Sequence, residues 1–517
     1  MRTRCLLRSA CTGLFVLLTC GAAYAQYTGN ITGIVIDPTG AAVANATLEA
    51  VNTATQVSAT AKSDSTGIFQ FLSLAPGPYK ITAEAQGFRK YEATVTLQTN
   101  QTLNVPISLE VGAVTEQTTV SAASPLVNTA ETRNELTLGT DSLSTLPLAG
   151  HSYIALATMA PGVSGLGTMG GGQPGGPGGT PGTGVDNYST ETAVDVSANG
   201  QGTVANQFIV DGLNVTSGIR QGVLNLTPNP DAIQEASIQV NTFSSEYGGS
   251  SSIQMASTTK SGSEQFHGLA SDYYNNENFF SNTVFMAPGQ KYNPFHAHNA
   301  SFTVGGPIIP KQQFFFFFAY EPLRSSRSTG NQTIFFPDQQ FATWASQNYP
   351  NTFGTRILNT YLPSAATISG VSKTAADVFP GTCGTPATNG LPCSTAMIDS
   401  GVFNSSNFRD GDQYFVRIDK HLKADRLYGS AFWTNLNYGG PAVIPQFSTT
   451  NHNTQQALQI NYTHIFSSST LNEAIFAQNR IEGFQGETGD FTIPSISVTG
   501  QSVGYGVGFA QGDFIQH

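Results

Sequence analysis

The sequence predicts a mainly β protein built from several antiparallel units. Charged residues make up only 11% of the 517 residues, against about 25% in a typical soluble protein. Glycine occupies 54 positions, and alternating apolar and polar runs recur between Gly- and Pro-rich turns. A coiled coil, a helical repeat array and a charge-rich disordered chain would each need a different composition.

Residues 1–25 are predicted to be a secretory signal peptide. Three arginines precede a short apolar core at 14–18, and Ala-Tyr-Ala at 23–25 has the small-x-small pattern of a cleavage site. An uncleaved anchor is disfavoured because the apolar core is too short to span a bilayer. A lipoprotein is disfavoured because Thr19 is an awkward residue before a lipidated Cys20. The mature protein is therefore expected outside the cytoplasm.

Residues 27–112 are predicted to form a small β-sandwich. Short apolar or alternating runs are separated here by turns rich in Gly, Pro and Asp. At about 85 residues the segment is long enough to bury a core of its own. The predicted strands lie at 34–36, 46–51, 68–71, 79–83 and 105–109.

Three motifs identify this segment further. They are Gly-Ile-Val-Ile-Asp at 33–37, Thr-Gly-Ile-Phe-Gln-Phe at 66–71 and Leu-Ala-Pro-Gly-Pro-Tyr at 74–79, followed by Gly-Phe at 87–88. On these motifs the segment resembles the carboxypeptidase regulatory-like (transthyretin-like) family. The resemblance implies an accessory module and not a catalyst.

The chain changes character after the sandwich. Residues 113–135 are polar and β-prone and are predicted to form a linker, whereas 136–262 mix helical and extended patterns. Within them, the Gly-rich run 162–184 is predicted to be a flexible loop. From 263 onward the dominant pattern is the alternating strand.

Alternation in these later strands allows two interpretations. Along 413–419 and 458–463, apolar side chains alternate with polar ones, although Phe415 falls on the polar face. A half-buried strand of a soluble protein shows this pattern, and so does an outer-membrane barrel strand with lipid on one side and water on the other. The signal peptide and the lack of helical segments favour the barrel. No later stretch approaches the roughly 20 apolar residues of a spanning helix.

A series of motifs from 113 to 435 supports the same interpretation. They lie at 146–150, 208–214, 230–235, 246–248, 258–262, 266–268, 305–308, 314–321 and 413–419. In this order they resemble the plug and early barrel of TonB-dependent outer-membrane receptors, especially the Oar-like subgroup with a regulatory-like domain in front. The chain departs from the family at His151, where members often have Arg, and at Gly249, where Arg is also common.

The resemblance implies a plug at 136–262 and the first part of a transmembrane barrel at 263–517. The plug motif residues are Asp211, Gly212, Glu246, Tyr247 and Gly248. A barrel of about 22 strands needs roughly 300 residues, more than follow residue 262, so the chain is expected to be a C-terminally truncated fragment. The barrel would contact outer-membrane lipid.

The resemblance also implies a TonB box in the linker. The candidate residues are Thr118, Thr119, Val120, Ser121 and Ala122. A flexible β-prone strand can add to the sheet of a TonB-type energy-transducing protein of the inner membrane, so that a pull on it reaches the plug. An ordinary linker strand is the alternative.

Motifs for catalysis are missing from the sequence. It contains no HExxH, Walker A or GxSxG pattern, and the GxGxxG match at 165–170 lies inside the Gly-rich loop. No enzyme activity, cofactor or metal site is therefore predicted. Cys383 and Cys393 remain after removal of the signal peptide, and they are predicted to close a loop with a disulfide because they are close in sequence and exported.

The leading functional hypothesis is energy-coupled uptake of a scarce extracellular solute, an oligosaccharide or a metal chelate. The alternative is a surface adhesion or protein-interaction role without transport. A secreted enzyme with an accessory domain is a third hypothesis, but it requires a catalytic motif. Nucleic-acid binding is excluded because the net charge is −11 and no basic stretch is present.

Overall fold

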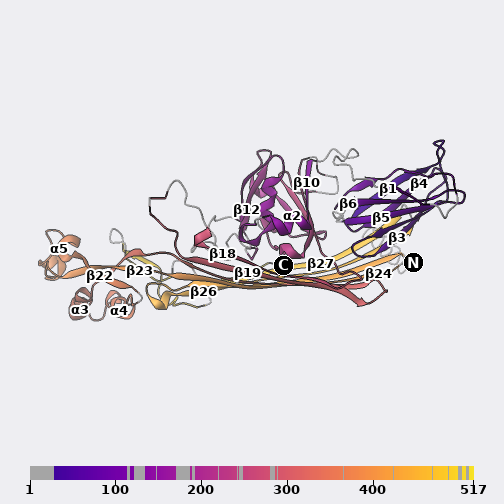
Figure 1. The fold of residues 1–517 in the computed structure, drawn as a ribbon. Helices are drawn as coiled ribbons and strands as arrows, with labels where there is room; N and C mark the ends of the chain where they lie inside the picture. Colours follow the sequence, from indigo (N-terminus) through magenta and orange to yellow (C-terminus); the bar gives the residue numbers. More distant parts are fainter. Residues whose placement is uncertain are drawn as a thin grey trace, which may run out of the picture.

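The computed structural model confirms a mainly β protein with four parts (Figure 1). They are an N-terminal sandwich, a middle domain, a long-stranded antiparallel sheet (the long sheet) and a cap of short elements. No helix in the described part of the chain is long and apolar enough to cross a membrane. The described residues are 28–112, 117–120, 134–146, 148–169, 187–188, 192–218, 221–241, 243, 248–279, 286–287, 289–364, 366–422, 424–467, 470–486, 488–498, 503–507 and 512–516.

The sandwich consists of two sheets packed over one apolar core. One sheet contains β4 (Ile68–Leu74), β1 (Gly29–Ile36) and β7 (Thr102–Asn104), with β8 (Ile107–Ser108) also paired to β1. The other has the order β3 (Ser58–Lys62), β2 (Thr47–Asn52), β5 (Gly77–Glu84), β6 (Lys90–Leu97) and β9 (Gln117–Val120). Alternate residues of most of these strands point inward and are almost fully buried, whereas in β3 they are only partly buried. Strands β3, β6 and β7 add to those expected from the sequence.

The middle domain contains two small sheets and several single-turn helices. Its first sheet has the order β10 (Asn134–Gly139), β16 (Ile233–Asn241), β17 (Gln254–Thr259), β13 (Gln207–Val210) and β14 (Leu213–Asn214). Its second has the order β11 (Val163–Met169), β12 (Thr192–Ala198) and β15 (Val223–Leu224). The helices are α2 (Thr140–Thr145), η1 (Ala149–His151), η2 (Tyr153–Met159), η3 (Thr203–Ala205) and η4 (Pro230–Ala232).

The long sheet is antiparallel throughout. Its order is β18 (His267–Asn276), β19 (Phe295–Ile309), β20 (Phe314–Ser328), β24 (Ser406–His421), β25 (Asp425–Gly440), β26 (Thr449–Ser467), β27 (Thr470–Gln485) and β30 (Gly512–Gln516). The short helix η5 (Glu277–Phe279) follows β18. Three hairpins close at one end of the sheet, where Ile309 pairs with Phe314, His421 with Arg426, and Ser467 with Thr470, and the longer connections lie at the other end. Outer-membrane barrels have this asymmetry, with the short turns on the periplasmic side.

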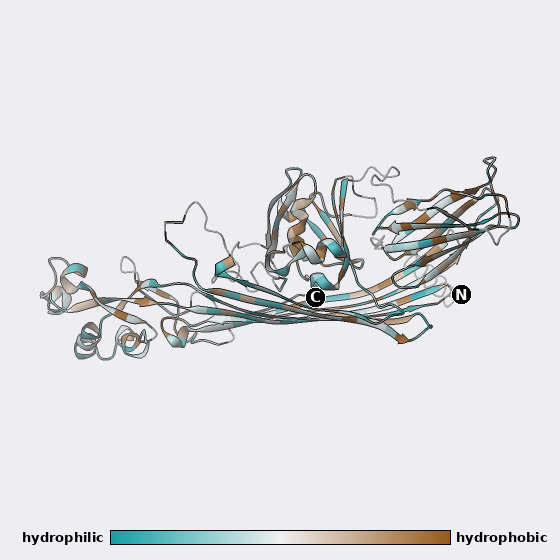
Figure 2. Cartoon of the chain, viewed as in Figure 1, coloured by the Kyte–Doolittle hydropathy of each residue, from teal (hydrophilic) through white to brown (hydrophobic). Residues whose placement is uncertain are grey.

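Polarity in the long sheet is the reverse of that in a soluble protein. The apolar side chains that alternate along β24 and β26 are 38–46% exposed; they are Tyr414, Val416, Ile418, Leu458, Ile460 and Tyr462. The polar side chains between them are at most 7% exposed; they are Gln413, Arg417, Asp419, Gln459, Asn461 and Thr463. The middle domain lies over the middle of one face of the long sheet (Figures 1 and 2), and its Asp211 contacts the polar residues Arg417 and Gln459 of that face. An exposed apolar face suits lipid, so the structure supports the barrel interpretation.

An aromatic row marks the outer edge of this apolar face. Phe302 pairs with Tyr320, Tyr320 with Tyr414, and Tyr414 with Trp433, across four adjacent strands. The rings of Tyr320 and Tyr414 stack with centroids 4.9 Å apart. Aromatic girdles of this kind lie at the interface between hydrocarbon and head groups.

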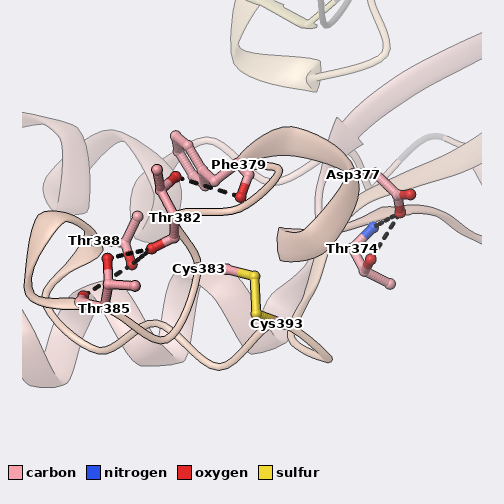
Figure 3. The surroundings of a disulfide bond; sticks show 8 residues. All are labelled: Thr374, Asp377, Phe379, Thr382, Cys383, Thr385, Thr388 and Cys393. Atoms are coloured by element: carbon pink, nitrogen blue, oxygen red, sulfur yellow. Dashed lines mark hydrogen bonds between the residues drawn. A yellow bond between two sulfur atoms is a disulfide. The ribbon is translucent and has the colours of Figure 1, made fainter.

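The cap lies mainly in the long connection between β20 and β24. It contains β21 (Gln332–Pro337), α3 (Gln339–Asn348), α4 (Phe353–Thr360), β22 (Thr367–Thr374), α5 (Ala375–Val378), η6 (Pro386–Thr388) and β23 (Ala396–Phe403). A shared apolar cluster joins it to η7 (Pro445–Phe447) and to the hairpin of β28 (Ile496–Val498) and β29 (Val503–Tyr505). In the structure Cys383 and Cys393 form a disulfide with their Cα atoms 5.0 Å apart (Figure 3).

A charge placed on the lipid face tests this orientation. Val416 pairs with Phe318 and Ala431 in the apolar band, whereas Asn437 points outward beyond the aromatic row. We expect Val416→Arg to cost about 2–4 kcal/mol of folding free energy in a bilayer, and Asn437→Arg about 0–1 kcal/mol. Urea titration of the purified protein folded into phospholipid vesicles measures both. Equal costs would contradict the assignment of the lipid face.

Candidate functional site

One buried polar contact between the middle domain and the long sheet starts from a two-residue hairpin. Val210 pairs with Leu213, so Asp211 and Gly212 alone connect β13 to β14. Their φ angles are 47° and 83°, both in the left-handed region. A turn with two positive φ angles favours Asp-Gly, because Asp tolerates this region and Gly adopts it without strain. The Asp-Gly pair therefore directs one carboxylate at the long sheet.

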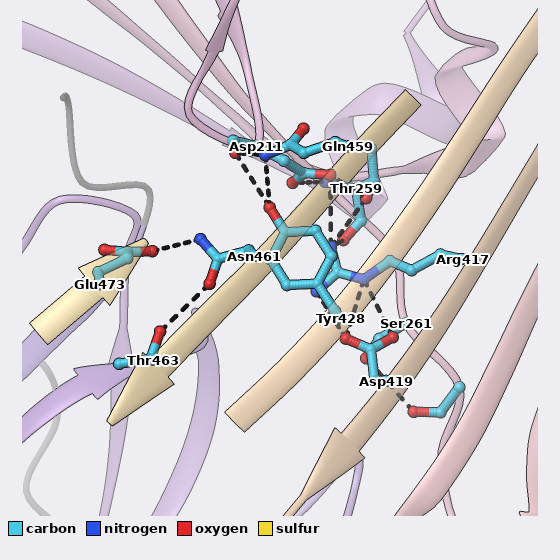
Figure 4. Close-up of polar contacts among 11 residues, drawn as sticks. Asp211, Thr259, Ser261, Arg417, Asp419, Tyr428, Gln459, Asn461, Thr463 and Glu473 are labelled. Carbon is cyan, nitrogen blue, oxygen red and sulfur yellow. Dashed lines mark hydrogen bonds and ion pairs between the residues drawn. The ribbon is translucent and has the colours of Figure 1, made fainter. Parts of the chain in front are cut away.

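The Asp211 carboxylate is bound from both sides (Figure 4). Thr259 donates its backbone N–H to Oδ1 at 2.9 Å and its hydroxyl to Oδ2 at 2.5 Å. From β24, Arg417 approaches Oδ2 at 3.4 Å and donates to the Thr259 hydroxyl at 2.9 Å. Arg417 also makes a bidentate pair with Asp419, with its Nη2 2.8 Å from Oδ1. One guanidinium thus balances two buried carboxylates.

Two neighbouring strands complete this cluster. Tyr428 of β25 donates its hydroxyl to the Asp211 carbonyl at 3.1 Å, and Gln459 of β26 donates to the same oxygen at 2.5 Å. The Arg417 guanidinium lies 4.4 Å from the centroid of the Tyr428 ring. Burial raises the pKa of Asp211, and Arg417 and Thr259 oppose this shift. Three adjacent strands therefore bind one hairpin turn, and we name these residues the Asp211–Arg417 contact.

A second buried polar contact, between His151 and Glu321, joins the same two parts. His151 Nδ1 lies 2.7 Å from Oε1 of Glu321, and both side chains are at most 1% exposed. Asn187 donates to the other oxygen of Glu321 at 2.6 Å. The His151 ring also lies against Tyr273 of β18, with centroids 4.0 Å apart. His151, which departs from the family pattern, thus pairs with an acid from the inner face of β20.

The sandwich contacts the middle domain through a buried carboxyl. The backbone N–H of Thr99 donates to Glu235 Oε1 at 2.5 Å, and the Thr99 hydroxyl lies 3.2 Å from that of Thr258. Burial raises the pKa of Glu235 to about 7, although its hydrogen bonds with Thr99 act in the opposite direction. The nearby Glu135 raises this pKa further. This contact therefore titrates near neutral pH.

The predicted TonB-box residues lie partly in a strand of the sandwich. Thr118, Thr119 and Val120 belong to β9, whose backbone pairs in parallel with β6. Ser121 and Ala122 lie outside the described residues. The candidate segment is therefore brought to the edge of the sandwich and not to the Asp211–Arg417 contact.

The remaining predicted site residues are dispersed. Gly248 is exposed, and Glu246 and Tyr247 lie outside the described residues. The disulfide of Cys383 and Cys393 lies in the cap. Across the described ranges, no group of three or more His, Cys, Asp or Glu side chains is arranged to hold a metal ion.

Arg417, Thr259 and Glu321 were not selected from the sequence as site residues. Two of them carry a signal in the sequence. Arg417 and Glu321 occupy inward positions of strands whose outward positions are apolar. A charge on the inner face of such a strand needs a partner from whatever fills the lumen. The sequence alone does not identify this partner, because the partner residue comes from a distant part of the chain.

Removing the shared cation should weaken the joint between the two parts. We expect Arg417→Gln to cost about 3–5 kcal/mol, because two buried carboxylates lose their counter-charge. Arg417→Lys should lose less. As a control, Arg324→Gln on the outward face removes a half-exposed ion pair with Asp412 and should cost about 0–1 kcal/mol. Thermal unfolding in detergent measures all three, and an Arg417→Gln variant as stable as wild type would contradict the contact.

The Glu235 contact should depend on pH. A carboxyl with a pKa near 7 in the folded protein and an ordinary pKa of 4.5 when unfolded binds more protons when folded. Its contribution to stability is therefore greatest below about pH 4.5 and is lost as pH rises through about 7. Hydrogen exchange at the Thr99 amide should become faster over this range in the wild type and stay flat in Glu235→Gln, after correction for intrinsic exchange. The same dependence in both proteins would assign the effect to another group.

Comparison with known proteins finds two matching domain families and a similar transporter. An outer membrane beta barrel domain model matches residues 258–514, and a carboxypeptidase regulatory-like domain model matches 30–110. The chain is similar to the TonB-dependent transporter Oar of Myxococcus xanthus, with 25% identity over 335 residues that cover 60% of this chain.

Two solved structures share the general arrangement at low similarity. The outer membrane transporter YddB from Escherichia coli aligns with 8% identity and a TM-score of 0.33, over 68% of this chain and 48% of its own. The siderophore receptor PirA from Acinetobacter baumannii aligns with 10% identity and a TM-score of 0.31, over the same shares. At these scores neither alignment carries weight by itself.

The chain spans 28% of the length of its curated relative Oar, and 48% of the two solved proteins. The order of the matched parts is the one expected from the motifs, with the regulatory-like domain first and the outer-membrane barrel domain last. This chain therefore carries an N-terminal carboxypeptidase regulatory-like domain followed by an outer membrane beta barrel domain, and it is similar to the Oar-like TonB-dependent transporters.

Proposed function

We propose that this chain acts in energy-coupled uptake of a scarce solute across the outer membrane. The observation that carries the proposal is the reversed polarity of the long sheet, whose buried polar face binds the middle domain. A membrane-embedded sheet whose polar face is covered by a folded domain is suited to a solute pathway that opens when the domain moves. The family is one of transporters and not of enzymes, which is consistent with this role.

In this proposal each part of the chain has one role. Residues 263–517 form the membrane-embedded wall, 136–262 form the plug, and 27–112 form a periplasmic accessory domain. Residues 113–135 link the accessory domain to the plug and contain the TonB box at 118–122. The sandwich lies over the end of the long sheet that carries the short turns, which supports a periplasmic position (Figure 1).

Movement of the plug requires the Asp211–Arg417 contact to open. Pulling the Asp211 turn away would leave the Arg417–Asp419 pair on the wall, so the wall keeps a neutralised charge. The Asp211 carboxylate would keep its bonds from Thr259, which is in the same domain. Each side therefore retains partners after separation, which limits the cost of opening and makes the contact suitable as a reversible joint.

The solute would first meet the cap on the extracellular side. A cavity of about 430 Å³ lies between the cap sheet and the β28–β29 hairpin. Most of its lining residues are apolar or aromatic, among them Phe335, Tyr361 and Tyr505. Aromatic rings stack on the apolar faces of sugars and on planar chelating groups, so an oligosaccharide and a metal chelate both fit.

The alternative function is surface adhesion or protein interaction without transport. The sandwich and the folded cap support it, since both present large surfaces outside the membrane. It requires neither an energy source nor an inner-membrane partner. Removal of the TonB box therefore separates the two functions.

Deleting residues 118–122 should abolish uptake and leave binding of the solute to whole cells unchanged. The physical reason is that the pull of the TonB-type protein then has no strand to act on. Uptake of a labelled solute, compared with wild type and with de-energised cells, is the measurement. A deletion of equal length at 126–130 is the matched control and should retain more uptake. Normal uptake without 118–122 would favour the adhesion function.

A further inference from the structure

The edge of the sandwich at β6 is occupied by the chain's own linker. Strand β9 pairs with β6 through four register pairs, Lys90 with Gln117 through Ala93 with Val120. The other side of β6 is bonded to β5, where Ala83 pairs with Tyr91. Without β9, strand β6 would be an edge strand with a row of unpaired backbone groups. The linker thus covers an edge that would otherwise accept a foreign strand.

The chain is brought back to this edge by specific backbone contacts. After β8, the N–H of Arg89 donates to the carbonyl of Glu110 at 2.8 Å, and the N–H of Gly112 donates to Gly87 at 3.2 Å. Phe88 and Val111 form an isolated bridge between the same segments. These contacts hold the chain beside the start of β6. The pairing of β9 is therefore the continuation of an anchored segment.

The pairing itself is well suited to exchange. It is parallel, and parallel ladders are slightly less stable per residue than antiparallel ones. It is also short, and no further described strand lies beyond β9 in the sheet order. A partner that offers a longer or antiparallel edge could replace β6.

We propose that β6 is the resting site of the TonB box, and that the TonB-type partner must strip β9 from this edge before it can pull on the plug. This inference rests on the proposed function, because it concerns how the same segment is regulated. While β9 is paired, a pull on it is shared with the sandwich, which is itself bonded to the middle domain at Thr99 and Glu235. Once β9 is released, the pull reaches the plug through the linker without first having to break the pairing with β6.

A reversible covalent lock tests the proposal in the intact protein. Glu92 and Thr119 are register partners, so Glu92→Cys with Thr119→Cys places two thiols for a disulfide between β6 and β9. Lys80 and Thr94 are register partners in β5 and β6, and cysteines there lock the same domain without touching β9. Both double variants are expressed in the source cells and oxidised with copper phenanthroline. Uptake of labelled solute is measured before and after a mild thiol reductant, with the wild type treated in parallel.

We expect the oxidised β6–β9 lock to lower uptake to the level of the 118–122 deletion, and reduction to restore it. The β5–β6 lock should transport like the wild type in both states. Normal uptake by the oxidised β6–β9 lock would overturn the proposal, because the partner would then add to the outer edge of β9. A loss that reduction does not reverse would also count against it, since a folding defect is not relieved in this way. If the 118–122 deletion itself transports normally, the proposed function fails independently of the lock.

Discussion

The structure depends on one constraint, which is that hydrocarbon offers no hydrogen-bond partner to a polar group. The long sheet meets it by closing its backbone bonds between strands and by turning apolar side chains outward. Its polar side chains must then find partners on the inner face. The middle domain supplies them, and its apolar core continues into Phe317, Ala319, Phe415 and Phe432 of the long sheet. The long sheet and the middle domain are therefore parts of one packed unit.

The charged contact between Asp211 and Arg417 is almost fully buried. A buried ion pair contributes little net stability, but it is costly to break on one side only. Such contacts specify how the middle domain sits in the sheet more than they strengthen the whole. The Asp211 turn and the His151–Glu321 pair act at separate places, so they fix both position and orientation. The contact between Thr99 and Glu235 connects the middle domain to the sandwich, and the sandwich in turn binds the TonB-box candidate through β9.

Sequence alone was informative where the physical signal is local. Alternation at 414, 416 and 418 predicted a strand, and the Asp-Gly pair at 211–212 is a hairpin signal by itself. Local alternation does not reveal which face of the strand is buried, because a lipid-facing strand and a core-facing strand have the same pattern. The partner of Asp211 could not be inferred, since Arg417 reaches it only through the register of β24 against the middle domain. The parallel pairing of β9 was also hidden, because it depends on how 110–112 return to β6. The cap could not be predicted because its helices are short and its sheet joins distant segments.

The apolar face of the long sheet meets lipid, whereas its polar face meets the middle domain. The most direct test places a fluorescent label at single cysteines from 413 to 419 in the membrane-embedded protein. Quenching by a lipid-soluble and by a water-soluble quencher is then compared at each position. The account predicts strong quenching by the lipid-soluble quencher at 414, 416 and 418, and protection from both quenchers at 413, 415, 417 and 419. Lipid quenching at the odd positions, or at none, would contradict it.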